Sequence, residues 1–159
     1  EAVLALVESP QWFGEIAAFD GLARTHDAIA AIDTVVVHVP TPALDAMLTT
    51  HPEWWRLLAL LVTAKLRMAF VALEDLSVMP LPLRVARQLV LMAEGYGEWS
   101  DCSKRVVKVR QELLAAMVNA SRQTTNQVLK ELEARGLIKL AYGEIEIVDL
   151  SGLRGAHVA

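Results

Sequence analysis

The chain has 159 residues, of which 54% are hydrophobic, and this is enough apolar sequence for a folded protein with a sizeable core. Such a composition excludes an intrinsically disordered chain. The single cysteine, Cys102, excludes a disulfide framework and a cysteine-based metal centre. No signal peptide and no apolar run long enough to cross a bilayer is visible. We therefore expect a reduced, cytoplasmic protein without a membrane partner.

Charge is distributed unevenly along the chain. The formal net charge of −4 would by itself argue against a nucleic-acid partner. Residues 1–79 carry 4 Lys and Arg against 10 Asp and Glu, a balance of −6, whereas residues 80–159 carry 11 against 9, a balance of +2. Any DNA-binding surface is therefore expected in the C-terminal half.

Residues 1–51 alternate apolar runs with turn residues and predict a small β domain or the end of one. The Val-rich runs 2–7 and 34–40 predict strands. Asp20-Gly21 predicts a turn between them. A short helix is expected from Thr41, with Thr41 as its N-cap and Pro42 at its first helical position.

Residues 52–79 predict one long helix, because no Gly or Pro interrupts them after Pro52. Apolar residues form two neighbouring stripes at spacings of three and four, so the helix needs two partners. One partner is its own domain, and the other is a second copy of itself in a parallel coiled coil. The alternative is a helix buried in the core of a monomer.

Pro80 and Pro82 end this helix and mark the start of a third region, residues 80–159. Its pattern predicts a helix ended by Gly95 and Gly97, a strand Lys104–Arg110, two helices beginning near residues 111 and 122, and two short strands about Tyr142-Gly143. Two helices joined by a turn and followed by a β-hairpin are a winged helix-turn-helix.

Details of the turn and of the second helix fit this motif. Ala115 and Ala116 are small where the two helices must cross, and Asn119 tolerates the left-handed conformation that the turn requires. Ser121 is expected to cap the second helix through its hydroxyl. The buried stripe of that helix is predicted to comprise Thr124, Val128, Leu129 and Leu132.

The remaining side chains at the start of the second helix are polar and are expected to be exposed. Arg pairs with guanine, and Gln or Asn with adenine, while Lys and hydroxyl groups suit the phosphate backbone. A solvated helix surface is the alternative for each residue alone, but their clustering favours DNA contact. The candidate DNA-binding residues are Ser121, Arg122, Gln123, Thr125, Asn126, Gln127 and Lys130.

A second informative stretch, "FGEIAAFDGLART", covers residues 13–25. Gly14 permits close backbone packing before a short helical turn whose N–H groups suit an anion. Arg24 and Thr25 supply a guanidinium and a hydroxyl that suit a phosphate, and Glu15 suits a sugar hydroxyl. The alternative is a β-turn with a buried Arg–Glu ion pair.

The stretch "RQELLAAMVNASRQTTNQVLKELEARGLIKLAYGEIEIVDLSGL" resembles the DNA-binding domain of the Crp/Fnr transcription regulators. The resemblance implies an α+β fold with the C-terminal part of a cyclic-nucleotide-binding β-roll, a dimerisation helix and a winged helix-turn-helix. It also implies base contacts by Arg122, Gln123 and Gln127 and a phosphate contact by Ser121. The implied partners are double-stranded DNA, a second copy of the chain through the helix 52–79, and RNA polymerase.

The stretch 13–25 is similar to the phosphate-binding cassette of that family's sensor, with Gly14, Glu15, Arg24 and Thr25 on the matching positions. This implies cyclic AMP or cyclic GMP as the effector. The family usually has a small apolar residue where His26 stands, and often Thr or Ser near Ala69-Phe70.

Three functional classes fit the sequence to different degrees. A ligand-gated transcription regulator is favoured. A cyclic-nucleotide-binding module whose C-terminal domain binds protein is the alternative, against which the polar start of the 122–135 helix argues. An enzyme is not expected, because the sequence offers no catalytic residues: it has no nucleophile–base pair, no metal-ligand set and no Walker-type loop.

Overall fold

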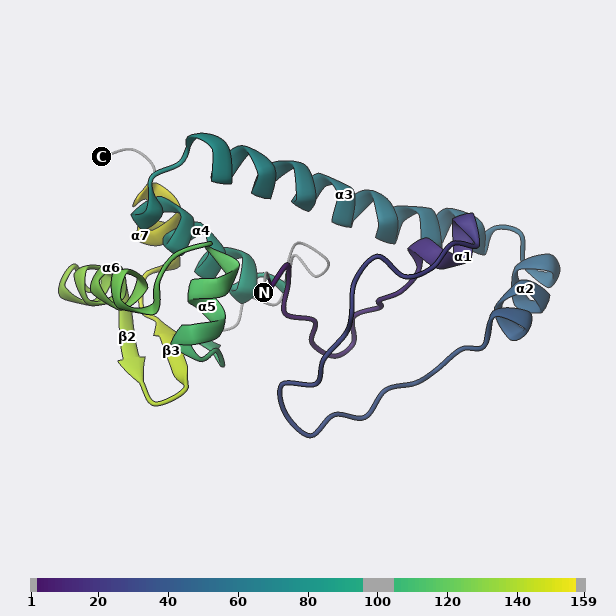
Figure 1. The fold of residues 1–159 in the computed structure, drawn as a ribbon, viewed down its shortest axis with the longest axis horizontal. Helices are drawn as coiled ribbons and strands as arrows, with labels where there is room; N and C mark the ends of the chain where they lie inside the picture. The colour runs from purple at the N-terminus through teal and green to yellow at the C-terminus, as the bar shows by residue number, and fades with distance from the viewer. Residues whose placement is uncertain (1–2, 96–104, 157–159) are drawn as a thin grey trace. The chain divides into compact units, whose positions relative to one another are not determined.

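The computed structural model describes residues 3–95 and 105–156, so Gly97, Cys102 and Lys104 lie outside the described residues. The chain divides into two compact units (Figure 1). One is Pro10–Leu66, and the other joins Glu1–Ser9 to Arg67–Ala159. The boundary between the units falls between Leu66 and Arg67, inside the long helix α3 (Trp54–Val78). The boundary expected from the sequence, between residues 79 and 80, lies at the end of that helix instead.

The C-terminal unit contains the predicted winged helix-turn-helix. Its elements are α4 (Leu81–Ala93), β1 (Val106–Val107), α5 (Gln111–Met117), α6 (Arg122–Ala134), β2 (Ile138–Ala141), β3 (Glu144–Ile147) and α7 (Leu150–Gly155). The antiparallel sheet has the order β1-β3-β2, so β3 is central. Val107 pairs with Ile145, which also pairs with Leu140 across the hairpin.

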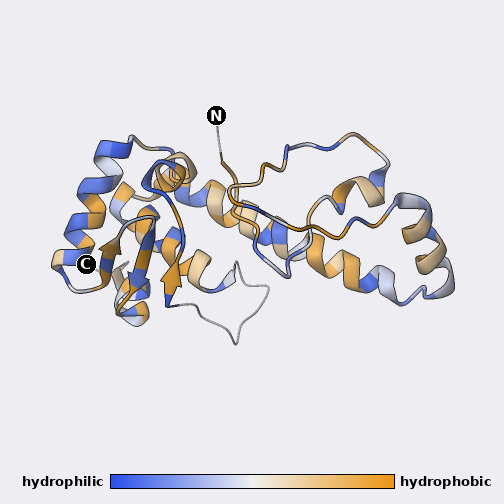
Figure 2. Ribbon diagram, turned by 90° about the horizontal axis from the view of Figure 1, so that it is seen from below, coloured by the Kyte–Doolittle hydropathy of each residue, from blue (hydrophilic) through white to orange (hydrophobic). Residues whose placement is uncertain are grey.

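The core of this unit is built from one apolar side of each helix and one face of the sheet. Leu89 of α4, Leu114 of α5, Leu129 of α6, Ile138 of β2 and Leu153 of α7 are all buried to 2% exposure or less. On each strand of the hairpin, buried and exposed residues alternate, as a sheet with one solvated face requires. In Figure 2, the ribbon of α6 changes between hydrophilic and hydrophobic colour along its length, which reflects the same one-sided burial.

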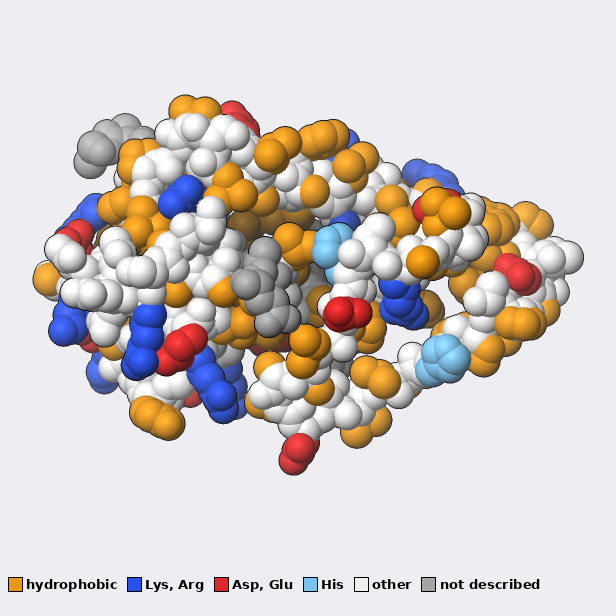
Figure 3. Space-filling model, viewed as in Figure 1, with side chains coloured by type: hydrophobic (Ala, Val, Ile, Leu, Met, Phe, Trp, Pro, Cys, Tyr) orange, Lys and Arg blue, Asp and Glu red, His pale blue; other side chains and the backbone are white. Residues whose placement is uncertain are grey.

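The predicted long helix is confirmed as α3 (Trp54–Val78), a single 25-residue helix. Pro80 then caps α4 with extended backbone, and Pro82 lies in the first turn of α4, where a missing N–H costs nothing. Large apolar side chains of α3 are exposed on more than one side of the helix, and Figure 3 shows apolar atoms along it. These residues are Leu57, Leu60, Leu66, Phe70, Leu73, Leu76 and Val78.

The strands expected at residues 2–7 and 34–40 are wrong. The described part of residues 1–51 contains α1 (Ile16–Asp20) and α2 (Thr41–Thr50), and the Val-rich runs within it form no strand. A strand requires a neighbour that accepts and donates its backbone hydrogen bonds, and the described residues supply none for Val35 and Val37, which are 97% and 92% exposed. The helix at Thr41 is confirmed, but Pro40 is its N-cap. The strand predicted at 104–110 is reduced to β1.

Candidate nucleic-acid interface, effector loop and hinge

The turn between α5 and α6 has the conformation that the sequence predicted. Asn119 has φ 50°, the left-handed region that Asn tolerates. Ser121 caps α6, since its Oγ accepts a hydrogen bond of 3.1 Å from the backbone N–H of Thr124. The hydroxyls of Ser121 and Thr124 also lie 2.7 Å apart. These bonds fix the start of α6 relative to the turn.

The buried face of α6 comprises Thr125, Val128, Leu129 and Leu132. The prediction exchanged the two threonines: Thr124 is exposed, whereas Thr125 is completely buried. Thr125 therefore cannot meet a ligand on the surface of α6, and its assignment as an exposed DNA-binding residue is wrong. Thr124 was missed as a surface residue, although its position three residues after the Ser121 cap is a signal for it.

The other polar residues at the start of α6 lie on its solvent side. Arg122, Gln123, Gln127 and Lys130 are exposed, and Asn126 is half-buried. We call these five residues the polar face of α6. Lys and Arg side chains lie on the side of the molecule that carries α6 and the β2–β3 hairpin, and Asp and Glu side chains lie among them (Figure 3).

Arg122 has a surface partner in the helix before it. Its Nη1 lies 3.1 Å from Oε1 of Glu112 on α5, and both side chains are more than half exposed. Such a pair contributes little to stability, so a phosphate or a base edge can replace Glu112 at small cost.

The hairpin is attached to α6 by one bond that sequence reasoning missed. Oε1 of Glu133 accepts a 2.7 Å hydrogen bond from the backbone N–H of Leu140 on β2. Tyr142, at the tip of the hairpin, is fully exposed beside Gly143, whose φ of 73° makes the tight turn possible. The helix and the wing are therefore held as one piece, with an aromatic ring at the wing's end.

The segment of residues 13–26, which we call the effector loop, brings two of the predicted residues together. Gly14 has φ 87°, and a Cβ built on it would clash with the guanidinium of Arg24. The guanidinium thus occupies the space that a side chain at position 14 would need. Thr25 is exposed, and its Oγ1 forms a 2.8 Å hydrogen bond with Nδ1 of His26.

Glu15 has a different partner from the one considered in the sequence. Its carboxylate is buried at 4% side-chain exposure and lies 2.9 Å from Nζ of Lys65 on α3, which also donates to the carbonyl of Trp12. Within the described ranges, no ion pair joins Glu15 to Arg24. Glu15 therefore anchors the loop to α3 and leaves the guanidinium of Arg24 to other partners.

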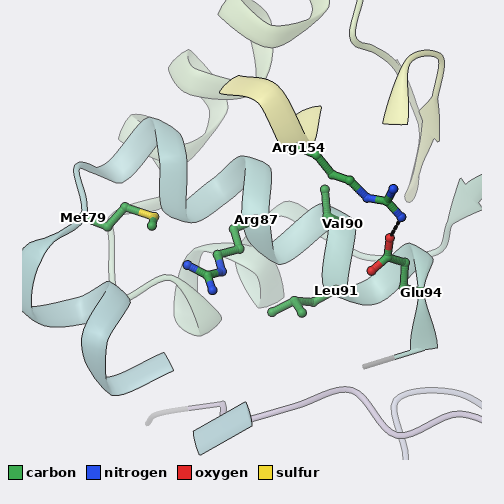
Figure 4. Close-up of a pocket in the computed structure, with 6 residues that line it drawn as sticks. All are labelled: Met79, Arg87, Val90, Leu91, Glu94 and Arg154. Carbon is green, nitrogen blue, oxygen red and sulfur yellow. Dashed lines mark hydrogen bonds and ion pairs between the residues drawn. The ribbon is translucent and has the colours of Figure 1, made fainter. Parts of the chain in front are cut away.

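The junction of α3 and α4 carries an ion pair. Nη1 of Arg87 donates a 2.7 Å hydrogen bond to Oδ1 of Asp75, whose side chain is 11% exposed. Arg87 also borders a shallow hollow of about 540 Å³, together with Met79, Val90 and Leu91 (Figure 4). The ion pair of Glu94 with Arg154 of α7 forms the far side of this hollow.

Metal-binding and membrane-spanning features are absent from the described residues. They contain no group of three or more His, Cys, Asp or Glu placed to hold a metal ion. No described helix is long and apolar enough to cross a membrane. The candidate functional features of the described residues are therefore the polar face of α6 and the effector loop.

The fold and the polar face of α6 define a winged helix-turn-helix protein, and comparison with known proteins specifies the family. Residues 83–156 match the Crp-like helix-turn-helix domain. Over 150 residues the chain is 31% identical to the CRP-like cAMP-activated global transcriptional regulator of Mycobacterium tuberculosis, covering 94% of this chain and 67% of that protein. It is 32% identical to the transcriptional regulator SdrP of Thermus thermophilus, covering 95% and 71%.

Solved structures agree with this assignment. A CRP/FNR-family transcriptional regulator from Thermus thermophilus matches with a TM-score of 0.57 and 31% identity, over 68% of this chain and 56% of that one. The chain belongs to the Crp/Fnr family of transcription regulators. It spans little more than half the length of that solved relative.

Proposed function

We propose that the protein binds a two-fold symmetric site on double-stranded DNA as a homodimer, with α6 as the recognition helix in the major groove. One observation carries the proposal: the start of α6 exposes a cluster of polar side chains, while the opposite face of the helix is buried in the core. A helix end that is rigidly held and rich in hydrogen-bonding groups suits the reading of base edges.

Each residue of the polar face has a role that follows from its chemistry. Arg122, Gln123 and Gln127 are assigned to base edges, because guanidinium and amide groups form paired hydrogen bonds with guanine and adenine. Lys130 and the Ser121 hydroxyl are assigned to the phosphate backbone, and the amide of Asn126 suits an adenine edge as the other amides do. The burial of Thr125 removes it from this set and gives it a packing role.

The exposed apolar side chains of α3 support the dimer. Leu66, Phe70 and Leu73 follow one another at spacings of four and three, and each is more than half exposed. A second copy of the same helix would remove this surface from water. Two copies related by a two-fold axis present two α6 helices, which suits half-sites one DNA turn apart.

We further propose that a phosphate-bearing effector acts through the effector loop, with cyclic AMP and cyclic GMP as the candidates. Gly14, Arg24 and Thr25 would meet the phosphate, and the Glu15–Lys65 pair would transmit its binding to α3. The contact of Arg24 with Gly14 supports this arrangement, since any larger residue at position 14 would displace the guanidinium.

The test is selection from a pool of random DNA duplexes by the full chain at fixed salt, with and without cyclic AMP. We expect enrichment of a palindromic site. Arg122→Ala and Gln127→Ala should each weaken binding by about 1–3 kcal/mol and relax the preference at one position per half-site. Arg135→Ala is the matched control, because Arg135 is an exposed arginine at the other end of α6.

Three outcomes are informative. Enrichment that strengthens with cyclic AMP supports both proposals. Enrichment indifferent to cyclic AMP and cyclic GMP supports DNA recognition and removes these nucleotides as effectors. No enrichment at all overturns DNA recognition and favours a domain that binds protein.

A further inference from the structure

The ion pair between Glu112 and Arg122 lies at the start of both helices of the helix-turn-helix. Glu112 is in the first turn of α5, and Arg122 is the first residue of α6. Both backbone positions are fixed, because Leu114 and Ala115 bury one face of α5 and the Ser121 hydroxyl caps α6. The carboxylate therefore stands at a defined place beside the side chain that is assigned to a base edge.

The geometry of the pair leaves one edge of the Arg122 guanidinium open. Oε1 of Glu112 lies 3.1 Å from Nη1, and no other described residue forms an ion pair with this arginine. Nε and Nη2 form a different edge of the planar group, and parallel N–H groups on one edge suit the O6 and N7 acceptors of guanine. A guanine can therefore meet the Nε–Nη2 edge while the carboxylate stays at Nη1.

The charge of Glu112 has the opposite effect on a phosphate. The Glu112 side chain is 58% exposed, so an anion that approaches Arg122 also meets this carboxylate. Repulsion between the two anions offsets part of the attraction of the guanidinium for the phosphate. A guanine edge is uncharged and meets no such repulsion. Glu112 thus disfavours the contact that any DNA sequence offers, and it permits the contact that only guanine offers.

We propose that Glu112 is a positioning residue that makes Arg122 read guanine rather than bind the phosphate backbone. By holding one edge of the guanidinium, it reduces the side-chain freedom that is lost when the other edge meets the base. The inference rests on the proposed function of α6, and it adds a residue of α5 that contacts no base itself. A carboxylate in the first turn of a helix also stabilises that helix, but such a role does not change base preference.

The experiment is competition binding at fixed salt with the full chain and with Glu112→Gln. The probes are the duplex enriched by the unaltered chain, the same duplex with each guanine replaced in turn, and a duplex that lacks the site. For Glu112→Gln we expect the guanine preference at one position of each half-site to fall about threefold, the effect of one exposed charge pair. Binding to the duplex that lacks the site should tighten by about the same factor.

Two controls separate positioning from the mere loss of a negative charge. Glu131→Gln removes the same charge from an exposed residue of α6 that has no ion pair in the described part of the chain. It should leave the guanine preference unchanged. When residue 122 is already alanine, Glu112→Gln should no longer alter the preference at that position, because the side chain that it positions is absent.

Each contrary outcome has a distinct meaning. If the unaltered chain enriches no duplex, the proposed function falls and the role of Glu112 falls with it. If a duplex is enriched but Glu112→Gln keeps the full guanine preference, or Glu131→Gln lowers it equally, the role of Glu112 is overturned while DNA recognition stands. An equal loss of preference in the Arg122→Ala background also overturns that role, because the effect then does not act through Arg122.

Discussion

Breaking the Asp75–Arg87 ion pair should have unequal effects on stability, depending on which residue is replaced. The Asp75 side chain is 11% exposed and that of Arg87 is 29% exposed. Arg87→Met leaves a nearly buried carboxylate without this counter-charge. Asp75→Asn leaves a guanidinium that can turn partly to water. We therefore expect Arg87→Met to be the more damaging change.

The magnitude follows from the burial of the two groups. Removing one partner of a fully buried pair costs about 3–5 kcal/mol, whereas an exposed pair contributes about 0–1 kcal/mol. Since the pair is largely but not fully buried, we expect a loss of about 2 kcal/mol for Arg87→Met and about 1 kcal/mol for Asp75→Asn. The double variant should lose less than Arg87→Met alone, because it leaves no carboxylate at position 75.

Guanidinium chloride unfolding of the variants measures these differences. Arg154→Met is the control, because its pair with Glu94 joins side chains that are 58% and 29% exposed, and the expected loss is under about 1 kcal/mol. The reasoning is refuted if Asp75→Asn destabilises as much as Arg87→Met, or if the double variant is the least stable of the three.

Four further changes test local features by thermal unfolding. Thr125→Val should leave stability unchanged or raise it by about 1 kcal/mol, because the buried hydroxyl has no hydrogen-bond partner among the described residues; a clear loss would show that the hydroxyl is satisfied. Ser121→Ala should cost about 1 kcal/mol through loss of the cap on α6, and an unchanged midpoint would contradict the capping bond. Asn119→Val should cost about 1–3 kcal/mol because of the left-handed backbone, whereas Asn119→Gly should cost little; equal effects would contradict the observed φ. Gly14→Ala should cost about 1 kcal/mol from its φ, with little added by Arg24, whose end can move away; no loss would mean that position 14 relaxes.

Features set by near neighbours in the chain could be predicted from the sequence. The turn at Asn119, the cap at Ser121 and the hairpin about Tyr142-Gly143 depend on residues a few positions apart, and all three are confirmed. The α+β class, the long helix and the winged motif follow from the same local patterns and are also confirmed. The candidate DNA-binding residues that were expected to be exposed are exposed, except for Asn126, which is half-buried, and Thr125, which is buried.

Features that depend on distant partners could not be predicted. The Val-rich runs have the composition of strands, but pairing decides whether a strand forms, and Val35 finds no partner in the described chain. Near the start of α6 both Thr124 and Thr125 lie three or four residues before buried positions, so helical spacing alone does not choose between them. Glu15 and Lys65 are 50 residues apart, and nothing local indicates that they pair.

The two prolines at the junction of α3 and α4 also determine where the chain can pivot. The backbone N–H of Met79 still bonds to Asp75, so the helical ladder of α3 extends to Met79, and the ring of Pro80 holds its φ at −58°. The carbonyl of Pro80 accepts hydrogen bonds from the backbone N–H groups of Leu83 and Arg84, so the helical hydrogen bonding of α4 begins at its first turn. Rotation is left to ψ of Met79 and ψ of Pro80. A turn about these bonds would move α4 as a rigid body, and the Asp75–Arg87 ion pair, which joins α3 to α4 across the junction, resists that turn.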